Sequence, residues 1–277
     1  MLNKTILKCP VCGKSLLKEL KNYTCPANHI YDIAKQGYCN LLLANQKFSK
    51  EPGDSKAMVQ SRKDFLNTGH YSALANSISE IVLEHYSKCS TPYNILDSGC
   101  GEGYYLDYLE KNIIKNNINY YGFDISKEAV KQAAIRNKNI TWTVGSSFNM
   151  TVLPDSIDCL INVFAPICEM EFKRVLKKGG IIISATPGKE HLFGLKEILY
   201  EKPYYNDEEV NNIYGFEIKQ KVHIKYNISL QKTEDIKNLL TMTPYFWRTE
   251  QDKIKKIDEI SNLDTCVHFI ITIYEKS

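Results

Sequence analysis

The feature that most constrains the fold is a glycine-rich turn between an apolar strand and a helix. Residues 94–96 read as the end of a buried strand, and the sequence DSGCGEGYY follows at positions 97–105. Glycines occupy positions Gly99, Gly101 and Gly103. They permit a sharp turn and a close approach of the backbone to a ligand, because a Cβ atom there would collide with it. The pattern predicts a strand–turn–helix unit that binds a small molecule.

The acids beside this turn indicate which molecule binds. A second apolar strand ends at Asp124, where a carboxylate is placed to accept hydrogen bonds from both ribose hydroxyls of a nucleoside. The spacing G-x-G-x-G differs from the G-x-G-x-x-G of dinucleotide sites, and the turn begins with Asp97. A carboxylate here can hold the methionine end of S-adenosyl-L-methionine (SAM). The turn resembles motif I of class I SAM-dependent methyltransferases, although a tight turn in another α/β protein is an alternative.

Strands and helices alternate along most of the chain. The patterns predict helices over 56–66 (capped by Asp54), 72–86, 103–111, 126–136, 167–176 and 189–198, and strands over 94–97, 119–123, 140–144, 157–163 and 180–185. Such alternation predicts a parallel sheet covered on both faces. The tail adds strands over 217–230 and 266–274 and helices over 233–241 and 250–261. We expect an α/β, Rossmann-like fold with a mostly parallel seven-stranded sheet.

A separate metal-binding pattern precedes this domain. The spacing C-x2-C-x12-C-x3-H is formed by Cys9, Cys12, Cys25 and His29. Two such knuckles joined by a hairpin over 14–24 can close a tetrahedral zinc site. The segment is too short to bury a core of its own, so metal binding would fold it. We predict structural Zn²⁺ here, with unligated thiols as the alternative.

The charges of the chain are unevenly distributed. Residues 1–63 contain eleven Lys and Arg against four Asp and Glu, and the remaining residues contain 24 against 28. A basic end predicts a polyanionic partner, although a solvated basic face would look the same. Near the zinc pattern, Tyr23 could stack on a base. The candidate phosphate contacts are Lys14, Lys18, Lys21, Lys35, Arg62 and Lys63.

The carboxyl end of the fourth expected strand supplies an acceptor pocket. Residues 157–161 run into Asn162, Phe164 and Pro166. Because the carboxyl ends of parallel strands face the ligand crevice, these side chains are expected where the methyl acceptor meets SAM. Phe164 could stack on a base or simply pack in the core, and Asn162 could bond the cofactor or the acceptor. A general base cannot be named from the sequence.

The composition suggests a compartment. The chain has nine cysteines, several of them within expected strands or turns, and its first residues contain no apolar signal core. The sequence has no run of 18 apolar residues that would predict a membrane span. We expect a cytoplasmic protein with no membrane association.

At this point the resemblance to a family is specific. The motifs at 35–38, 51–55, 69–71, 97–105, 162–166, 186–188 and 242–248, together with the four zinc ligands, resemble the RlmA family of 23S rRNA guanine-N1 methyltransferases, which includes the tylosin-resistance group. The resemblance implies that Cys9, Cys12, Cys25 and His29 hold zinc. It also implies SAM contacts from Tyr71, Gly101, Glu102 and His191. Asp97, Gly99, Asp124 and Asn162 complete the expected SAM-binding set.

The resemblance also implies domains, a substrate and partners. We expect a zinc-binding RNA-recognition domain over 1–44, a linker and helix over 45–70, and a SAM-dependent methyltransferase domain over 71–277. The expected substrate is N1 of a guanine in a hairpin of domain II of 23S rRNA, near the peptide exit tunnel, and methylation there would affect macrolide susceptibility. A homodimer could embrace the hairpin. Alternatives are methylation of another RNA or of a small molecule, or a non-catalytic RNA-binding protein.

Overall fold

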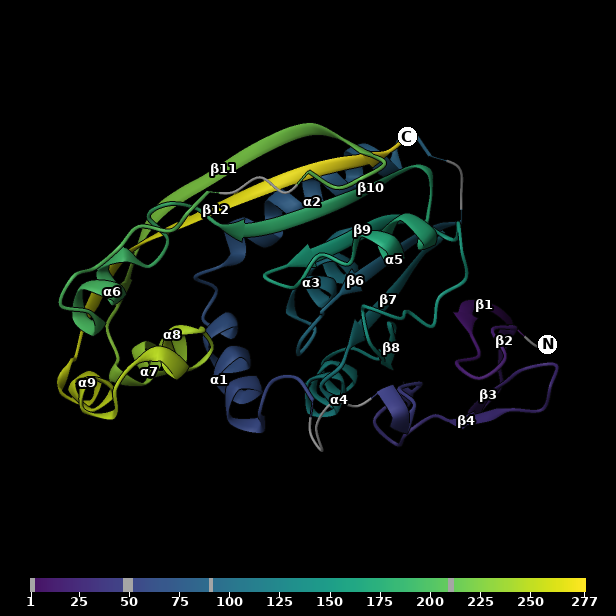
Figure 1. Cartoon of the computed structure of the whole chain (residues 1–277), viewed down its shortest axis with the longest axis horizontal. Helices are drawn as coiled ribbons and strands as arrows, with labels where there is room; N and C mark the ends of the chain where they lie inside the picture. The colour runs from purple at the N-terminus through teal and green to yellow at the C-terminus, as the bar shows by residue number, and fades with distance from the viewer. Residues whose placement is uncertain (1–2, 47–51, 90–91, 209–211) are drawn as a thin grey trace.

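A computed structural model describes residues 3–46, 52–89, 92–208 and 212–277. Its centre is an eight-stranded sheet in the order β11-β12-β10-β9-β6-β7-β8-β5 (Figure 1). The strands are β5 (Tyr38–Asn40), β6 (Tyr93–Ser98), β7 (Ile118–Asp124), β8 (Thr141–Val144), β9 (Ile157–Val163), β10 (Leu176–Pro187), β11 (Phe216–Leu230) and β12 (Leu263–Lys276).

The sheet confirms the predicted mostly parallel α/β architecture. Strands β5 to β10 pair in parallel, whereas β12 runs antiparallel to both β10 and β11. Seven strands come from residues 93–276, as predicted, and β5 adds an eighth. This three-residue strand pairs Tyr38 with Trp142 and Asn40 with Val144. The predicted zinc domain therefore contributes an edge strand to the methyltransferase sheet.

Nine α-helices are found in the described ranges: α1 (Lys56–Asn67), α2 (Ser72–Tyr86), α3 (Tyr104–Asn112), α4 (Lys127–Arg136), α5 (Glu169–Val175), α6 (Phe193–Leu199), α7 (Thr233–Thr241), α8 (Tyr245–Arg248) and α9 (Gln251–Lys256). Serine side chains begin two of them. Ser55 Oγ accepts the Met58 amide, and Ser126 Oγ accepts that of Ala129. The helix over 56–66 is thus capped by Ser55, and the prediction of Asp54 as its cap was wrong.

Two other helix predictions need correction. The helix expected over 189–198 begins only at Phe193, because Leu192 has a φ of 56° and its amide donates to the Cys266 carbonyl across 2.7 Å. A residue in the left-handed region cannot lie inside an α-helix. The helix expected over 250–261 ends at Lys256 and is followed by a short 3-10 turn, Ile257–Glu259.

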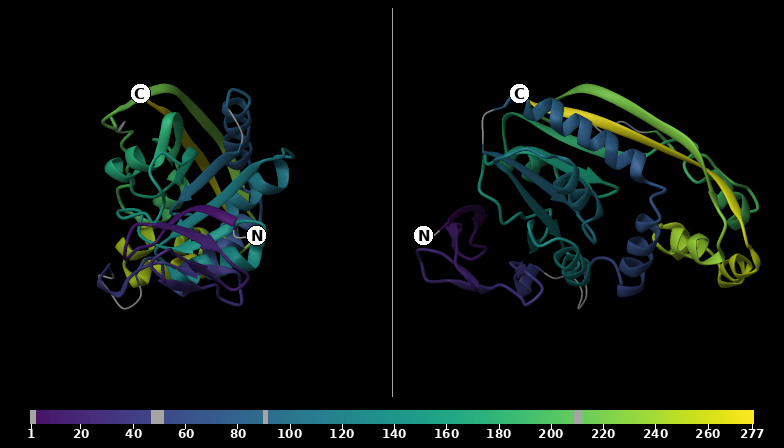
Figure 2. Two further views of the ribbon diagram at one scale, coloured as in Figure 1. Left: turned by 90° about the vertical axis from the view of Figure 1, so that its right-hand side faces the viewer. Right: turned by 180° about the vertical axis from the view of Figure 1, so that it is seen from behind.

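The N-terminal ribbon forms a second sheet beside β5, the edge strand of the large sheet. Its strands are β1 (Asn3–Lys8), β2 (Ser15–Lys18), β3 (Asn22–Thr24) and β4 (Ile30–Asp32), all antiparallel. Backbone hydrogen bonds fasten β1 to the catalytic part: the Lys8 amide donates to the Thr151 carbonyl (2.9 Å) and the Leu153 amide to the Ile6 carbonyl (2.8 Å). Figure 2 shows this ribbon packed against one side of the larger domain.

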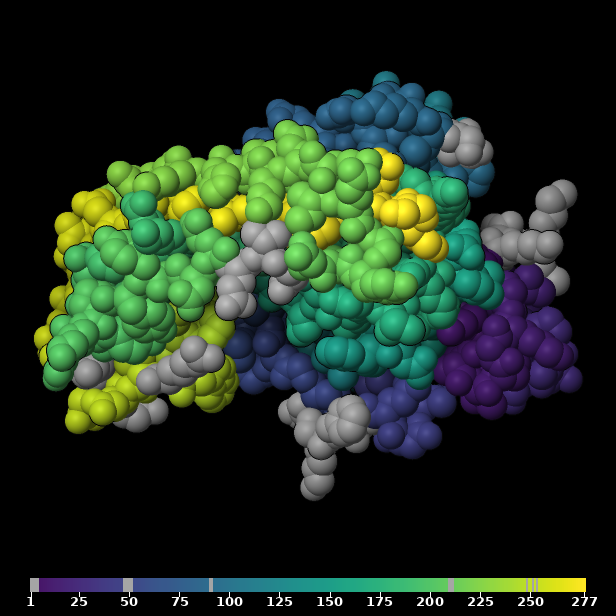
Figure 3. Space-filling model, turned by 45° about the horizontal axis from the view of Figure 1, so that its top comes forward, coloured from purple at the N-terminus to yellow at the C-terminus, as the bar shows by residue number. Residues whose placement is uncertain are grey.

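The antiparallel pair of β11 and β12, whose strands have 15 and 14 residues, extends past the other strands of the sheet. Helices α6 to α9 gather at its far end, and α7 packs against α1. The space-filling view places these helices and the N-terminal ribbon at opposite ends of the molecule (Figure 3). No helix in the described ranges combines the length and apolarity that a membrane span requires.

Candidate active site and metal centre

The glycine turn after β6 has the close-approach geometry that the sequence predicts. Gly99, Gly101 and Gly103 have φ angles of 84°, 54° and 85°. A Cβ added to Gly99 would lie 2.6 Å from Ala165 Cβ, and one added to Gly103 would lie 2.7 Å from the Trp142 ring. The turn therefore depends on glycine both for its backbone conformation and for the space around it.

Asp124 is fixed at the tip of β7 by two backbone amides. One carboxylate oxygen accepts the Gly101 amide (2.9 Å), and the other accepts the Ser126 amide (2.8 Å). A segment from before α1 lies over this tip, because Ser126 Oγ donates to the Asp54 carbonyl (3.1 Å) and the Asp54 carboxylate pairs with Arg62. Nothing in the sequence pattern indicated this cover over the Asp124 corner.

The acids of the turn are buried together. Burial raises the pKa of Asp97 to about 8, and the nearby charges of Asp124 and Glu102 add to the effect. Burial also raises the pKa of Asp124, despite the two amides. Glu102 turns toward α4, where its carboxylate lies 2.9 Å from Arg136 Nη2. The contact between Glu102 and SAM stays a prediction. In this structure the Glu102 carboxylate is paired with Arg136.

Tyr71 and His191, both predicted to contact SAM, lie against each other in the fold. Tyr71 Oη lies 3.4 Å from His191 Nε2, and the edge of the Tyr71 ring packs on Phe269 at a centroid distance of 4.8 Å. Burial lowers the pKa of His191 to about 3. The imidazole is therefore neutral at pH 7. Its Nδ1 accepts the His268 amide (3.3 Å), so its proton is on Nε2, facing Tyr71.

The three acceptor-pocket candidates lie together where β9 ends. Phe164 is 45% exposed, has a φ of 53°, and its ring stacks on His191 at 6.1 Å. A bulky residue in the left-handed region is uncommon and marks a constrained position. Asn162 is buried, and its amide donates to the carbonyls of Ser98 and Pro166, each at 3.3 Å. Asn162 thus braces the β6 and β9 ends, while Phe164 offers an open ring.

Phe269 is the site residue that the sequence analysis missed. Its ring lies 5.7 Å from that of Phe164 and 5.0 Å from that of His191, so it forms the floor beneath both. It comes from the middle of the apolar strand β12. No local signal distinguishes such a residue from an ordinary core residue.

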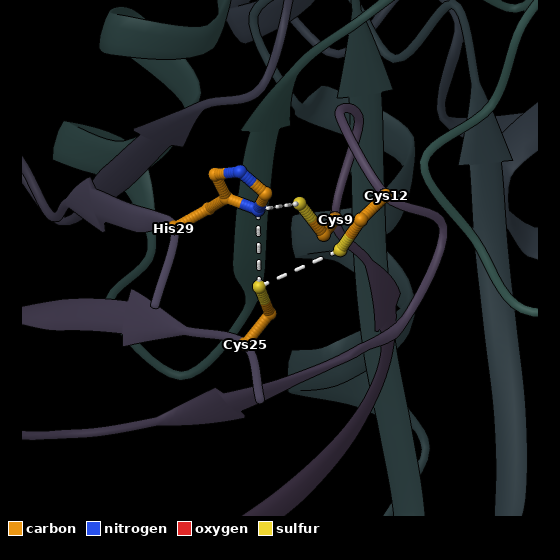
Figure 4. A group of neighbouring side chains, drawn as sticks. All are labelled: Cys9, Cys12, Cys25 and His29. Atoms are coloured by element: carbon orange, nitrogen blue, oxygen red, sulfur yellow. Dashed lines mark hydrogen bonds between the residues drawn. The ribbon is translucent and has the colours of Figure 1, made fainter. Parts of the chain in front are cut away.

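The four predicted metal ligands converge between the two knuckles of the ribbon (Figure 4). His29 Nδ1 lies 3.5 Å from Cys9 Sγ and 3.4 Å from Cys25 Sγ, and the Cys12 and Cys25 sulfurs are 3.6 Å apart. Tetrahedral Zn²⁺, with Zn–S near ~2.3 Å and Zn–N near ~2.0 Å, would hold its ligand atoms about 3.5–3.8 Å apart. The donor set therefore fits a closed, structural zinc site.

The predicted RNA contacts fall into two groups. The side chains of Lys14, Lys18, Lys21 and Lys35 are exposed on and beside the ribbon. Arg62 and Lys63 are on α1 instead, where Arg62 pairs with Asp54 and Lys63 bonds Gln132 (3.1 Å). Tyr23 is buried in the core. Its ring is not available for stacking, so that expectation was wrong.

Known proteins match both parts of the chain. Residues 7–50 match the family described as RlmA, N-terminal, and residues 90–257 match a methyltransferase domain family. A 23S rRNA (guanine(748)-N(1))-methyltransferase of Streptomyces fradiae is 30% identical over 70% of this chain and 67% of its own length. The chain belongs to the RlmA family of 23S rRNA guanine-N1 methyltransferases. A second relative, YxjB of Bacillus subtilis, provisionally named a 23S rRNA (guanine-N(1)-)-methyltransferase, is 27% identical over 97% of this chain and 96% of its own length.

Membership makes the chain a SAM-dependent rRNA methyltransferase with a structural zinc ribbon. The turn geometry fits SAM independently. The cradle at Gly99 has no room for a Cβ, and two carboxyl groups, Asp97 and Asp124, are buried close together. A ligand with a sulfonium and an ammonium group would favour the ionised form of these buried carboxyl groups.

Proposed function

We propose that this enzyme methylates N1 of a guanine in a hairpin of domain II of 23S rRNA, near the peptide exit tunnel, and thereby alters macrolide susceptibility. Support comes from the Streptomyces fradiae relative, whose name specifies guanine 748. The exposed basic side chains of the ribbon, Lys14, Lys18, Lys21 and Lys35, would contact the phosphates of that hairpin.

The observation that carries the proposal is the open ring of Phe164 over His191. A guanine that reacts at N1 must expose its Watson–Crick edge, so it has to leave its stack and enter a pocket. Phe164 is held at the β9 end by its own amide, which donates to the Ala185 carbonyl (3.0 Å). Its exposed ring then offers a stacking surface for the flipped base, and Pro166 closes the same loop.

The SAM side of the pocket is assigned from the buried polar groups. Asp124, held by the Gly101 and Ser126 amides, is placed to accept the ribose hydroxyls. Asp97 would face the methionine ammonium, and the backbone of Gly99 and Gly101 would border the methionine chain. Tyr71 and His191 would border the transferring methyl group, with Asn162 bracing the strand ends. Glu102 would contact SAM from beside its ion pair with Arg136.

For this methyl transfer the protein has to align guanine N1 with the methyl group of SAM and allow the N1 proton to leave. SAM, when bound, supplies an electrophilic methyl group on its sulfonium. Neutral guanine N1 carries a proton and a delocalised lone pair, so that proton must leave before or during the attack. The neutral Nε2–H of His191 can donate to guanine O6 but cannot accept the N1 proton. The pocket thus orients the reacting atoms, and water is the expected carrier of the proton.

The proposed division of work follows the domain boundaries expected from the sequence. Residues 1–44 would recognise rRNA, the linker and helix over 45–70 would connect them to the pocket, and residues 71–277 would carry out methyl transfer. Positions 47–51, including Glu51 of the 51–55 motif, lie outside the described residues. Two copies would embrace one hairpin as a homodimer.

Phe164→Ala tests the pocket. Single-turnover methylation of 23S rRNA is expected to fall by about 5- to 150-fold, since loss of a base stack costs roughly 1–3 kcal/mol. Binding of SAM, measured by calorimetry, should stay unchanged. Tyr214→Ala is the matched control, because that tyrosine is also exposed and precedes β11, at the end of the sheet where β10 begins. Equal rates for Phe164→Ala and the wild type would refute the pocket assignment.

A further inference from the structure

Three side chains that belong to neither site meet beside the antiparallel pair of β11 and β12. Glu208, His223 and His268 each offer a ligand atom, and these atoms lie within 4.8 Å of one another. His223 Nδ1 is 3.1 Å from His268 Nε2, and Glu208 Oε1 is 3.9 Å from His268 Nδ1. No sequence motif predicts this cluster, because its three residues are far apart along the chain.

The register of the β11–β12 pair explains why the two histidines converge. In the antiparallel β11–β12 pair, Lys225 is opposite His268 and His223 is opposite Ile270. His223 and His268 are therefore diagonal neighbours on one face of the sheet, a spacing that long side chains can bridge. His223 is exposed and His268 is buried, so the pair is open to solvent on one side.

Glu208 reaches the pair from the segment between α6 and β11. The Lys189 amide donates to Glu208 Oε1 across 2.7 Å, which orients the carboxylate. Two cations stand nearby, and one of them is neutralised, since Lys225 Nζ pairs with Glu190 across 2.6 Å. The other, Lys189, lies over the Tyr205 ring at 5.5 Å. The cluster therefore places an oriented carboxylate beside two imidazoles.

We propose that Glu208, His223 and His268 form a second, exchangeable binding site for a divalent transition-metal ion such as Zn²⁺ or Ni²⁺. Two imidazole nitrogens and one carboxylate oxygen are a ligand set that such ions favour. The observed nitrogen separation of 3.1 Å is close to what two imidazoles at ~2.0–2.1 Å from one ion require. Water would complete the coordination on the open side.

The site lies directly behind the candidate active site. The His268 amide donates to His191 Nδ1 (3.3 Å), so the backbone of one proposed ligand orients the imidazole that faces Tyr71. The Asn206 side chain, two residues before Glu208, donates to the Gly188 carbonyl (2.8 Å). A bound ion would thus fix the segment before β11 against the β11–β12 pair and stabilise the position of His191.

The test uses the full chain with one zinc in the ribbon, verified by elemental analysis, and Ni²⁺ as the probe in calorimetry. We expect one Ni²⁺ per wild-type chain. His223→Ala should bind Ni²⁺ about 100-fold more weakly, and Glu208→Gln about tenfold more weakly, as losses of ligands or their close partners do. His85→Gln removes an imidazole elsewhere, on α2, and should bind like the wild type.

A second probe separates this site from exchange in the ribbon. Co²⁺ bound at the His–His–Glu cluster gives no thiolate-to-metal charge-transfer band, whereas Co²⁺ that replaces the ribbon zinc does. The proposal also predicts slower amide exchange over residues 204–208 when Ni²⁺ is bound. Equal Ni²⁺ affinity in wild type and His223→Ala, no Ni²⁺ binding, or Co²⁺ bound with a thiolate band alone would each overturn it.

Discussion

Tyr71 Oη lies 3.4 Å from His191 Nε2, although the two residues are separated by 120 positions in the chain. The contact joins the start of α2 to the loop after β10. Because the His268 amide occupies His191 Nδ1, the tautomer that faces Tyr71 is fixed by the fold.

Tyr71→Phe tests this contact with little change in packing, since the ring contacts with Phe65 and Phe269 are retained. The variant loses the Tyr71–His191 hydrogen bond, worth about 0.5–1.5 kcal/mol, so the thermal midpoint is expected to fall by a few degrees. Because the same hydroxyl is proposed to border SAM, SAM affinity is also expected to fall, by roughly 3- to 10-fold, and calorimetry with SAM measures it. Tyr108→Phe, which removes a hydroxyl that bonds Asn76 outside the pocket, serves as the control. Unchanged SAM affinity in Tyr71→Phe would show that this hydroxyl has no role in the pocket.

Asp97 predicts how stability depends on pH. Burial raises its pKa from 3.8 to about 8 in the folded protein, so between these values the folded state holds a proton that the unfolded state has released. Stability should therefore fall as pH rises through this window, by up to about 1.4 kcal/mol per pH unit. Asp97→Asn cannot ionise and should flatten the profile between pH 6.5 and 8. His191, whose pKa is lowered to about 3 in the folded protein, is present in both proteins, so its titration in the unfolded chain cancels in the comparison. Urea unfolding at several pH values measures this, and parallel profiles would contradict the assignment.

The same carboxyl group predicts a proton linked to cofactor binding. If the cationic methionine end of SAM lies beside Asp97, binding favours the ionised form and releases a proton near pH 7. Calorimetry in two buffers of different ionisation enthalpy detects that proton. We expect release in the wild type and none in Asp97→Asn, together with weaker binding in the variant. Identical proton release in both proteins would place the methionine end elsewhere.

Gly99→Ala separates two costs of a side chain in the turn. Gly99 and Gly179 have similar φ angles, 84° and 74°, but an added Cβ meets Ala165 at 2.6 Å only at Gly99 and open space at Gly179. Gly179→Ala should cost only the conformational penalty, about 1–2 kcal/mol. Gly99→Ala adds a clash and should cost more, with loss of SAM binding. Chemical denaturation compares the two variants, and equal losses would mean that the turn tolerates a Cβ.

Removal of the zinc site should affect rRNA more than SAM. Cys25→Ser takes one ligand from the ribbon, whose short strands have little core of their own. The pocket residues come from other segments, so SAM binding is expected to persist while methylation of 23S rRNA is lost. Cys89→Ser, outside the cluster, should retain both activities and the zinc. Full methylation by a zinc-free Cys25→Ser protein would remove the ribbon from substrate recognition.

The sequence predicted those parts of the structure that depend on local spacing. The zinc ligands follow from two knuckles, and the glycine turn follows from three glycines within five positions. Strands β6, β7 and β9 follow from short apolar runs bounded by turn residues. In each case the signal and the structure lie within the same short segment, so no tertiary information was needed.

The remaining features depend on contacts between distant segments. Strand β5 has only three residues, and its pairing with β8 is decided by the free edge of that strand. Phe269 looks like any apolar strand residue until β12 brings it under Phe164 and His191. The left-handed Leu192, which delays the start of α6, is fixed by its bond to Cys266. None of these three features has a signal in the local sequence that would predict it.

The most direct test of the proposed function is to map the methyl group on 23S rRNA. Unmethylated 23S rRNA, incubated with the protein and SAM, is read by reverse transcription, because a methyl group on N1 blocks the Watson–Crick edge and stops the polymerase. We predict one new stop at a guanine of the domain II hairpin, present with the wild type and absent with Phe164→Ala. Methyl transfer to another position, or to tRNA or a small molecule in preference to 23S rRNA, would contradict the proposal.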